Sequence, residues 1–463
     1  MGWRESPARL FLLAQVDALV GIAFAYTRQA GKRPPHQQAC DGHVGQGSCH
    51  YKTHEQNCRK SVAWPLSTKR RSAVGVKTEI GYFHTFQEDL CMKRLTVFCG
   101  MLVLLLVLGT TPALAAKKFT IGFQPYDTIS YQVIVNAELG LWKKYVPEGV
   151  EFDFMPALQG TVVANNMLAN KAVVGHMSVM PATILCSKYQ QAEIKMVATS
   201  GMSEGTRCSL VLVRKDAPEM KTPEEVAQWL NGKVIAAPKG SASDQYLRRF
   251  FSKYNVKPKE YLNQSIEVIA TNFRIGKLDA ASLWEPTLSR ISTDVGEGLA
   301  RIVADGRACT NPDLGIVVMR ADFMRDNPEV AKAYMRSELE SQRFLMDPKN
   351  QKAVVDMVAK YATGIPKKVL WYSIYGHVPS ASADKKREWK SFYFNKRELD
   401  NIALSAPFLF QEKVIAIETL REGTVDDSLA RQVFKEAGYT PVEPDATLGY
   451  IIGGMPSDCP FTD

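Results

Sequence analysis

The sequence predicts an α/β fold in which two lobes, each built on a β-sheet, are joined by two long strands and enclose a cleft. Short apolar runs of strand length alternate with amphipathic segments of helix length, an order typical of a mostly parallel sheet with helices on both faces. The alternation starts again after residue 207, and the chain later returns through another strand. This return indicates a second lobe connected to the first by a hinge.

The first series begins at residues 117–125, which alternate in polarity and end at a proline turn. Further strands are expected at 150–154, 173–178 and 195–199, and helices at 130–145 and 160–170. In such sheets, ligands bind beyond the carboxyl ends of the strands. The turns at those ends are small or polar and carry no catalytic constellation: Gln124-Pro125-Tyr126, Gln159-Gly160-Thr161, Met180-Pro181-Ala182 and Ser200-Gly201-Met202.

The second series predicts strands at 210–213, 233–237, 265–269, 278–284 and 300–304, with helices opening at Thr222 and after Gly240. A strand at 314–319 then returns, and helices follow at 328–344, 412–422 and 425–437. We therefore expect lobe 1 to comprise residues 116–206 and 312–463, and lobe 2 to comprise residues 207–311.

The stretch from Lys233 to Tyr254 reads as a buried strand, a Gly240-Ser241-Ala242-Ser243 turn and an amphipathic helix. The first N–H groups of a helix lack internal partners, and the helix dipole favours negative charge there. The Ser241 and Ser243 hydroxyls either cap the helix or bind a ligand. The turn lacks the lysine and the second glycine of a nucleotide-binding loop, so we interpret it as a general ligand clamp.

The composition, with 46% hydrophobic and 23% charged residues, is typical of a globular protein. The formal net charge of +9 is concentrated in residues 1–94, and the remainder of the chain is nearly neutral. A nearly neutral chain makes nucleic acid an unsuitable partner.

A secretory signal peptide is expected at residues 92–115. Met92-Lys93-Arg94 precedes an apolar run and an Ala113-x-Ala115 cleavage site, so the mature chain is expected to start near Ala116 and to be exported. Residues 1–91 show no sustained hydrophobic period. We interpret them as an upstream extension without a native fold, and a cytoplasmic tail with a membrane anchor is the alternative.

The sequence lacks the common motifs of catalysis and of metal binding. It contains no Gly-x-Ser-x-Gly elbow, no phosphate-binding Lys-Ser/Thr loop, no His-Glu-x-x-His and no Cys-x-x-Cys, which argues against the enzyme classes that use them. After residue 115 the only histidines are His176 and His377, and His176 is expected in the core. We therefore expect no enzymatic activity, no metal and no cofactor.

Five segments together resemble the solute-binding proteins of ABC importers for nitrate, taurine, alkanesulfonates and thiamine-precursor pyrimidines. They are Gly122-Phe123-Gln124-Pro125, Gly140-Leu141-Trp142-Lys143-Lys144, 168–175, Gly240-Ser241-Ala242-Ser243 and Asp279-Ala280-Ala281-Ser282-Leu283-Trp284-Glu285-Pro286. The resemblance implies a type II periplasmic binding-protein fold. It also implies a monomer that passes a small ligand to a membrane permease without chemical change.

The resemblance implies that the ligand lies between the lobes. The positions that it carries over are Gln124, Tyr126, Gly160, Thr161, Met180, Ser200, Met202, Ser241, Ser243, Trp284 and Glu285. Trp284 either packs against the apolar part of the ligand or belongs to the core. Glu285 either bonds a ligand N–H or orients a cation such as Arg207.

Two arginines are candidates to bind a sulfonate, nitrate or carboxylate, because a guanidinium makes flat bidentate contacts with anions. They are Arg207 and Arg274, and a solvated surface position is the alternative for each. The ligand class therefore stays open between a small organic anion and a heteroaromatic compound.

Cysteines after residue 115 are Cys186, Cys208, Cys309 and Cys459. Cys208 and Cys309 each precede a strand that crosses between the lobes. The family places those strands side by side, which implies a Cys208–Cys309 disulfide at the hinge in an oxidising compartment. Cys186 is expected to be buried and free, and Cys459 has no obvious partner.

Two other functions remain open at this point. One is a sensor subunit that passes its ligand signal to a membrane kinase or chemoreceptor. The other is a pyrimidine-forming enzyme of the related fold, but the cysteine-rich iron motif of those enzymes is absent from this sequence.

Overall fold

The computed structural model describes residues 116–292, 295–376 and 386–462. All of them belong to a compact unit that spans residues 102–463. The expected extension at 1–91, the expected signal peptide at 92–115 and His377 lie outside the described residues. Within the described ranges, no helix combines the length and the apolar character that a membrane span requires.

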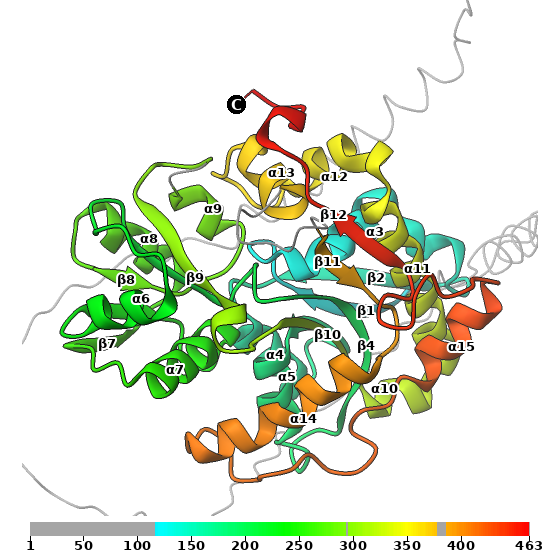
Figure 1. Ribbon diagram of the computed structural model, residues 1–463. Coiled ribbons are helices and arrows are strands. Elements are labelled where there is room, and N and C mark those ends of the chain that lie inside the picture. Colours follow the sequence, from blue (N-terminus) through cyan, green and yellow to red (C-terminus); the bar gives the residue numbers. More distant parts are fainter. Residues whose placement is uncertain (1–115, 293–294, 377–385, 463) are drawn as a thin grey trace, which may run out of the picture. The chain divides into compact units, whose positions relative to one another are not determined.

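The larger sheet has seven strands in the order β12-β11-β4-β10-β3-β1-β2 (Figure 1). Strand β1 pairs in parallel with β2 and β3, whereas β10 runs antiparallel between β3 and β4, and β11 is antiparallel to β4. The strands are β1 (Lys117–Phe123), β2 (Val150–Pro156), β3 (Val174–Ser178), β4 (Ile194–Ser203), β10 (Asp313–Arg320), β11 (Lys386–Lys390) and β12 (Gly449–Ile452).

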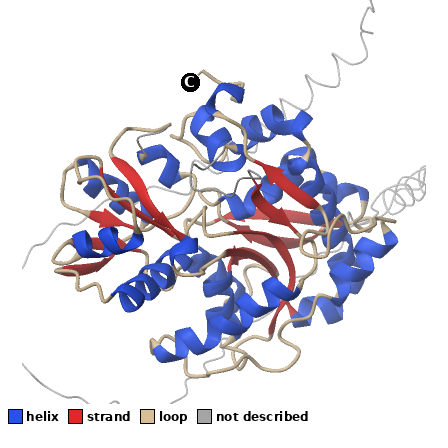
Figure 2. Ribbon diagram, in the orientation of Figure 1, coloured by secondary structure: helices blue, strands red, loops and turns tan. Residues whose placement is uncertain are grey.

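Helices cover both faces of this sheet (Figure 2), and alternate side chains of β10 enter two separate cores. Val317 and Met319 pack in the core shared with α3 and α11, while Ile316 and Val318 pack with α4, α5 and α14. This is the period of two that a strand imposes. The helices are α3 (Tyr131–Leu139), α4 (Gly160–Leu168), α5 (Val179–Cys186), α10 (Ala321–Asp326), α11 (Pro328–Met346), α12 (Gln351–Val358), α13 (Lys367–Tyr375), α14 (Lys396–Gln411) and α15 (Ser428–Glu436).

The smaller sheet has five strands in the order β7-β6-β8-β5-β9. Leu210 and Leu212 of β5 face one core, and Val211 and Val213 face the other. The strands are β5 (Leu210–Arg214), β6 (Val234–Ala237), β7 (Glu260–Asn263), β8 (Ala280–Ala281) and β9 (Ala300–Asp305), and the helices are α6 (Pro223–Leu230), α7 (Ala242–Tyr254), α8 (Ile266–Arg274) and α9 (Thr287–Ile291).

Two crossing segments, residues 204–209 and 306–312, connect the sheets, and they touch each other at two glycines. Gly205 has φ +81°, and a Cβ atom on it would lie 2.4 Å from the Cα atom of Gly306. The backbone N–H of Gly306 donates to the carbonyl of Gly205 at 3.4 Å. Only glycine fits such a close approach with a positive φ.

Four sequence predictions of secondary structure need correction. Residues 265–269, predicted as a strand, form the first turns of α8, because Ser265 caps a helix whose buried residues have helical spacing. Of the predicted strand 278–284, only Ala280–Ala281 pairs as β8. The predicted helix at 130–145 is interrupted at Gly140, which has φ +59°. Residues 412–422, predicted as a helix, lie beyond the end of α14 at Gln411.

Candidate functional site

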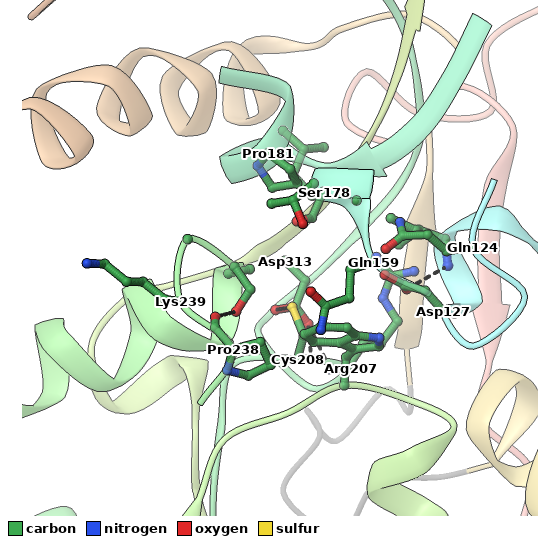
Figure 3. A pocket seen from close by; sticks show the side chains of 18 residues that line it. Gln124, Asp127, Gln159, Ser178, Pro181, Arg207, Cys208, Pro238, Lys239 and Asp313 are labelled. Carbon is green, nitrogen blue, oxygen red and sulfur yellow. Dashed lines mark hydrogen bonds between the residues drawn. The ribbon is translucent and has the colours of Figure 1, made fainter. Parts of the chain in front are cut away.

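A small cavity of about 40 Å³ opens where the crossing segments meet the carboxyl ends of strands from both sheets (Figure 3). Six of the predicted site residues line it: Gln124, Gly160, Thr161, Arg207, Ser241 and Trp284. Its remaining lining residues are Asp127, Ile129, Gln159, Ser178, Pro181, Cys208, Pro238, Lys239, Gly240, Ala242, Asp313 and Leu314. We call this cavity the cleft pocket.

Three helices begin at the cleft pocket. The N-cap residues of α4, α5 and α7 are Gln159, Ser178 and Ser241, and all three line it. Helices α4 and α5 have no side-chain hydrogen bond at their N-caps. The partial positive charges of three helix N-termini therefore converge on one cavity, where they favour a negative or hydrogen-bond-accepting group.

At the turn before α7, both predicted serine hydroxyls are engaged within the protein. Ser241 Oγ accepts from Asp244 N at 3.2 Å and donates to Pro238 O at 2.6 Å. Ser243 Oγ donates to Cys208 O at 2.8 Å and lies outside the pocket lining. Gly240 has φ +76°, and its N–H donates to Asp244 Oδ2. Ser241 is thus a helix cap that also faces the cavity.

Arg207 is almost fully buried at the pocket wall. Its Nη1 donates to Glu388 Oε1 at 2.9 Å and its Nη2 to Gly201 O at 3.5 Å, while its Nε has no partner in the described part of the chain. Burial lowers the pKa of Arg207, but the charges of Glu388 and Asp313 more than offset this, so the pKa is raised. The guanidinium is therefore a fixed positive charge.

Glu285 pairs with a buried cation, as one of its two sequence interpretations has it, but the cation is Arg387 and not Arg207. Its Oε1 accepts from Arg387 Nη2 at 3.1 Å and from Ser289 Oγ at 2.8 Å. Arg274 does not line the pocket either. It is an exposed residue that pairs with Glu297. Arg207 is therefore the candidate arginine that reaches the cavity.

Trp284 lines the pocket and bridges the two lobes. Its Nε1 donates to the carbonyl of Tyr126 at 2.9 Å. The Tyr126 side chain turns elsewhere, since its hydroxyl contacts Thr363. Apart from Tyr126, the predicted residues outside the lining are Met180, Ser200, Met202, Ser243 and Glu285, all of them buried.

Two buried carboxylates at the pocket were not predicted from the sequence. Asp313 accepts from five donors: Ser203 Oγ, Arg207 N, Cys208 N, Cys208 Sγ and Ser209 Oγ. Asp127 accepts from Ile129 N, and burial raises the pKa of its carboxyl to about 7. Asp127 could have been predicted as a pocket residue, because it comes two residues after the predicted Gln124-Pro125 turn. No motif or turn near Asp313 in the sequence indicates that it lines the pocket.

Lys239 also lines the pocket, but its side chain is exposed and extends away from the other labelled side chains (Figure 3).

Gln124 is fixed in position by two hydrogen bonds within the protein. Its backbone N–H donates to Ser130 Oγ, and its side-chain Nε2 donates to His176 O. His176 is fully buried, as expected, and its Nε2 lies 2.7 Å from Tyr334 Oη.

The expected Cys208–Cys309 disulfide is absent, and both residues are free thiols. Cys208 Sγ instead lies 2.9 Å from Asp313 Oδ1. Burial, followed by the charge of Asp313, raises the pKa of the Cys208 thiol well above its ordinary value. A thiol held protonated is a poor nucleophile. Cys186 is buried and free, as expected.

Across the described ranges, no group of three or more His, Cys, Asp or Glu side chains is arranged to hold a metal ion. The model of the NMT1-like family matches residues 113–359, slightly more than half of the chain. The chain belongs to the NMT1-like family. The matched range includes every residue of the cleft pocket, but the NMT1-like match ends before β11, which supplies Arg387 and Glu388.

Among curated proteins, this NMT1-like chain is similar to the taurine-binding periplasmic protein of Escherichia coli (strain K12). The two are 23% identical over 227 residues, which are 47% of this chain and 66% of the relative. The match therefore leaves about a third of that relative's length unaligned.

Among solved structures, the NMT1-like chain is similar to the periplasmic aliphatic sulphonate binding protein SsuA from Escherichia coli, with a TM-score of 0.54 and 16% identity over 68% of this chain and 99% of that one. It is also similar to the periplasmic nitrate-binding protein NrtA from Synechocystis PCC 6803, with a TM-score of 0.54 and 12% identity over 72% and 92%. These likenesses confirm the predicted two-lobed binding-protein fold.

Proposed function

We propose that this NMT1-like protein is the solute-binding component of an ABC importer and that it captures a small organic anion in the cleft pocket. The observation that carries the proposal is the convergence of the N-termini of α4, α5 and α7 on one cavity beside Arg207. Three helix dipoles and a guanidinium together favour an acidic group over a neutral one.

The ligand has two ends in this proposal. Its acidic oxygens accept hydrogen bonds from the first turns of α4 and α5, which carry no side-chain cap. Its apolar part packs against the Trp284 indole, which Tyr126 holds in place from the other lobe. The unpartnered Nε of Arg207 is a further donor, since a buried polar group without a partner calls for a bound group or water.

The relatives support this class of function. The curated relative is a taurine-binding protein and the structural neighbours bind aliphatic sulphonates or nitrate, as their names state. We infer that this chain likewise works in the periplasm with a membrane permease, as a monomer and without chemical turnover. The high pKa of the Cys208 thiol in the pocket favours binding over nucleophilic catalysis.

Ligand uptake in this proposal requires the lobes to separate. The cavity of about 40 Å³ has room for only a few water molecules, since a cavity needs about 10–15 Å³ to hold one. Opening would break the Trp284–Tyr126 bond between the lobes and move the crossing segments about Gly205 and Gly306. Closure around the ligand then produces the form that docks on the permease.

A thermal-shift panel tests the proposal. Nitrate, taurine, longer alkanesulfonates, carboxylates and an aminopyrimidine are added separately to the purified protein, and a ligand that binds only the folded state raises the melting temperature. We expect an organic anion to raise it. The rise should disappear in Arg207→Met and persist in Arg274→Met, an exposed arginine outside the pocket. A rise with the aminopyrimidine alone would contradict the anion assignment.

A second variant guards against misfolding of Arg207→Met. A Cβ atom at Gly160 would lie 2.8 Å from Pro181 Cγ, and both residues line the pocket. Gly160→Ala should therefore narrow the cavity and weaken the binding of the same ligand.

The intact mass of the exported protein tests the localisation, because it should fit a chain that begins near Ala116. Peptides recovered from residues 1–91 would contradict that start.

A further inference from the structure

A second cavity, of about 410 Å³, lies at the hinge and shares no lining residue with the cleft pocket. Five segments form it: the end of β4, the first crossing segment, helix α7, the second crossing segment and helix α14. We call it the hinge pocket, and its lining residues are Met202, Glu204, Arg249, Gly306, Arg307, Thr310, Asn311, Pro312, Arg397, Asp400, Asn401 and Leu404.

The three arginines of the hinge pocket differ in how their charges are balanced. Arg307 pairs with Asp305 at 2.7 Å, and Arg397 lies 3.7 Å from Glu204. The remaining acid of the lining, Asp400, pairs with Lys396. Arg249 takes part in none of the ion pairs within the described ranges. It is therefore the cation of this pocket whose charge has no acidic partner.

Arg249 is positioned by neutral groups. Its Nη1 donates to Asn311 Oδ1 at 3.0 Å, and its guanidinium lies 5.7 Å from the centre of the Phe408 ring. It is half-buried, and burial lowers its pKa. A guanidinium that is partly desolvated and unpaired gains strongly from an oxyanion, because charge-assisted bidentate bonds are the strongest that it forms.

Buried hydrogen bonds connect Arg249 to the cleft pocket. Asn311 Nδ2 donates to Ser209 Oγ at 2.9 Å, and Ser209 Oγ donates to Asp313 Oδ1 at 2.8 Å. Asp313 lines the cleft pocket, and the three connecting side chains are all almost fully buried. An anion on Arg249 would thus act at one end of a continuous polar chain whose other end faces the cleft.

We propose that the hinge pocket is an effector site that binds a small oxyanion, a carboxylate or a phosphate group, on Arg249. Met202, Pro312 and Leu404 supply an apolar wall for the rest of the molecule. Because the pocket takes Arg249 from one lobe and α14 from the other, its occupancy depends on how far the lobes are closed. Binding there and binding in the cleft therefore influence each other reciprocally.

Isothermal titration of the whole protein with inorganic phosphate, and separately with succinate, tests the site at constant ionic strength. We expect at least one of the two anions to bind saturably, and at least tenfold more weakly in Arg249→Met. The same binding should persist in Arg207→Met, which alters the cleft pocket, and in Arg274→Met, which alters an exposed ion pair elsewhere.

Two results would overturn the proposal. One is that neither anion binds saturably to the unaltered protein. The other is that the affinity is unchanged in Arg249→Met or falls only in Arg207→Met, which would assign the anion to the cleft. If Arg249→Met does not fold, Arg249→Lys replaces it. That variant keeps the charge but lacks the planar fork, so an affinity equal to that of the unaltered protein would also count against the site.

Discussion

Glu388 Oε1 lies 2.9 Å from Arg207 Nη1, and it lies equally close to Lys390 Nζ. All three side chains are almost fully buried. Glu388 therefore balances the charge that faces the cleft, although it lies on β11, beyond the range that matches the NMT1-like family. The ligand-facing arginine depends on a residue far along the chain.

This relationship predicts that Glu388→Gln is strongly destabilising. Removing the carboxylate leaves two buried cations without the negative charge that they share, which typically costs about 3–5 kcal/mol. The free energy of unfolding in urea measures the loss. Glu297→Gln is the matched control, because Glu297 pairs with the exposed Arg274, and surface ion pairs contribute little. Equal losses in the two variants would contradict the role of Glu388.

Asp127 should contribute a loss of stability as the pH rises toward neutrality. Burial raises the pKa of Asp127 from 3.8 to about 7, so the folded state holds a proton that the unfolded state has released. Between these two values the unfolded state binds fewer protons, and Asp127 costs about 1.4 kcal/mol of stability per pH unit. Below this window the contribution is constant. Glu338, whose pKa burial also raises to about 7, acts in the same direction. His176 acts in the opposite direction, because burial lowers its pKa to about 3 and its folded state releases a proton that the unfolded state holds.

Asp127→Asn isolates this effect. Unfolding free energies at pH 5 and pH 8 should differ less in the variant than in the unaltered protein. Anion binding in the cleft should also weaken above pH 7 in the unaltered protein, since Asp127 then carries a negative charge in the pocket, and this weakening should be smaller in the variant. Identical pH profiles for the two proteins would refute the assignment.

Trp284 should report ligand binding. Its indole lines the cleft pocket and bonds Tyr126 of the other lobe, so ligand binding changes its surroundings. The intrinsic fluorescence should change when ligand is added, and the change should be lost in Trp284→Phe. The affinity should also fall in that variant. Trp229→Phe is the control, because Trp229 lies on α6 away from the pocket. A Trp284→Phe protein with unchanged signal and affinity would exclude the role.

The contact between the crossing segments can be tested with two glycine substitutions. Gly205→Ala and Gly232→Ala both place a side chain at positive φ, which costs about 1–2 kcal/mol. A Cβ atom at Gly205 would also lie 2.4 Å from Gly306, whereas nothing lies within 4 Å of one at Gly232. Urea unfolding should therefore show a larger loss for Gly205→Ala. Equal losses would mean that the crossing segments readily move apart.

The sequence patterns predicted the elements that alternate or repeat locally, such as β10 and α11. They predicted the wrong structure for residues 265–269, because five residues are too few to separate a strand from the first turns of α8. The lining residues of the pocket that lie in turns at strand ends, such as Gln124 and Gly160, were predictable from the sequence. Asp313 and Glu388 were not, since their partners lie about a hundred residues or more away, at 106 and 181 residues from Arg207.

The position of β11 in the chain also sets an order of events. Arg207 receives its carboxylate partner only from a strand made 181 residues later. During synthesis from the N-terminus, this arginine therefore has no access to that carboxylate until β11 has been made. A chain that ended before β11 would lack the carboxylate that balances Arg207 at the cleft.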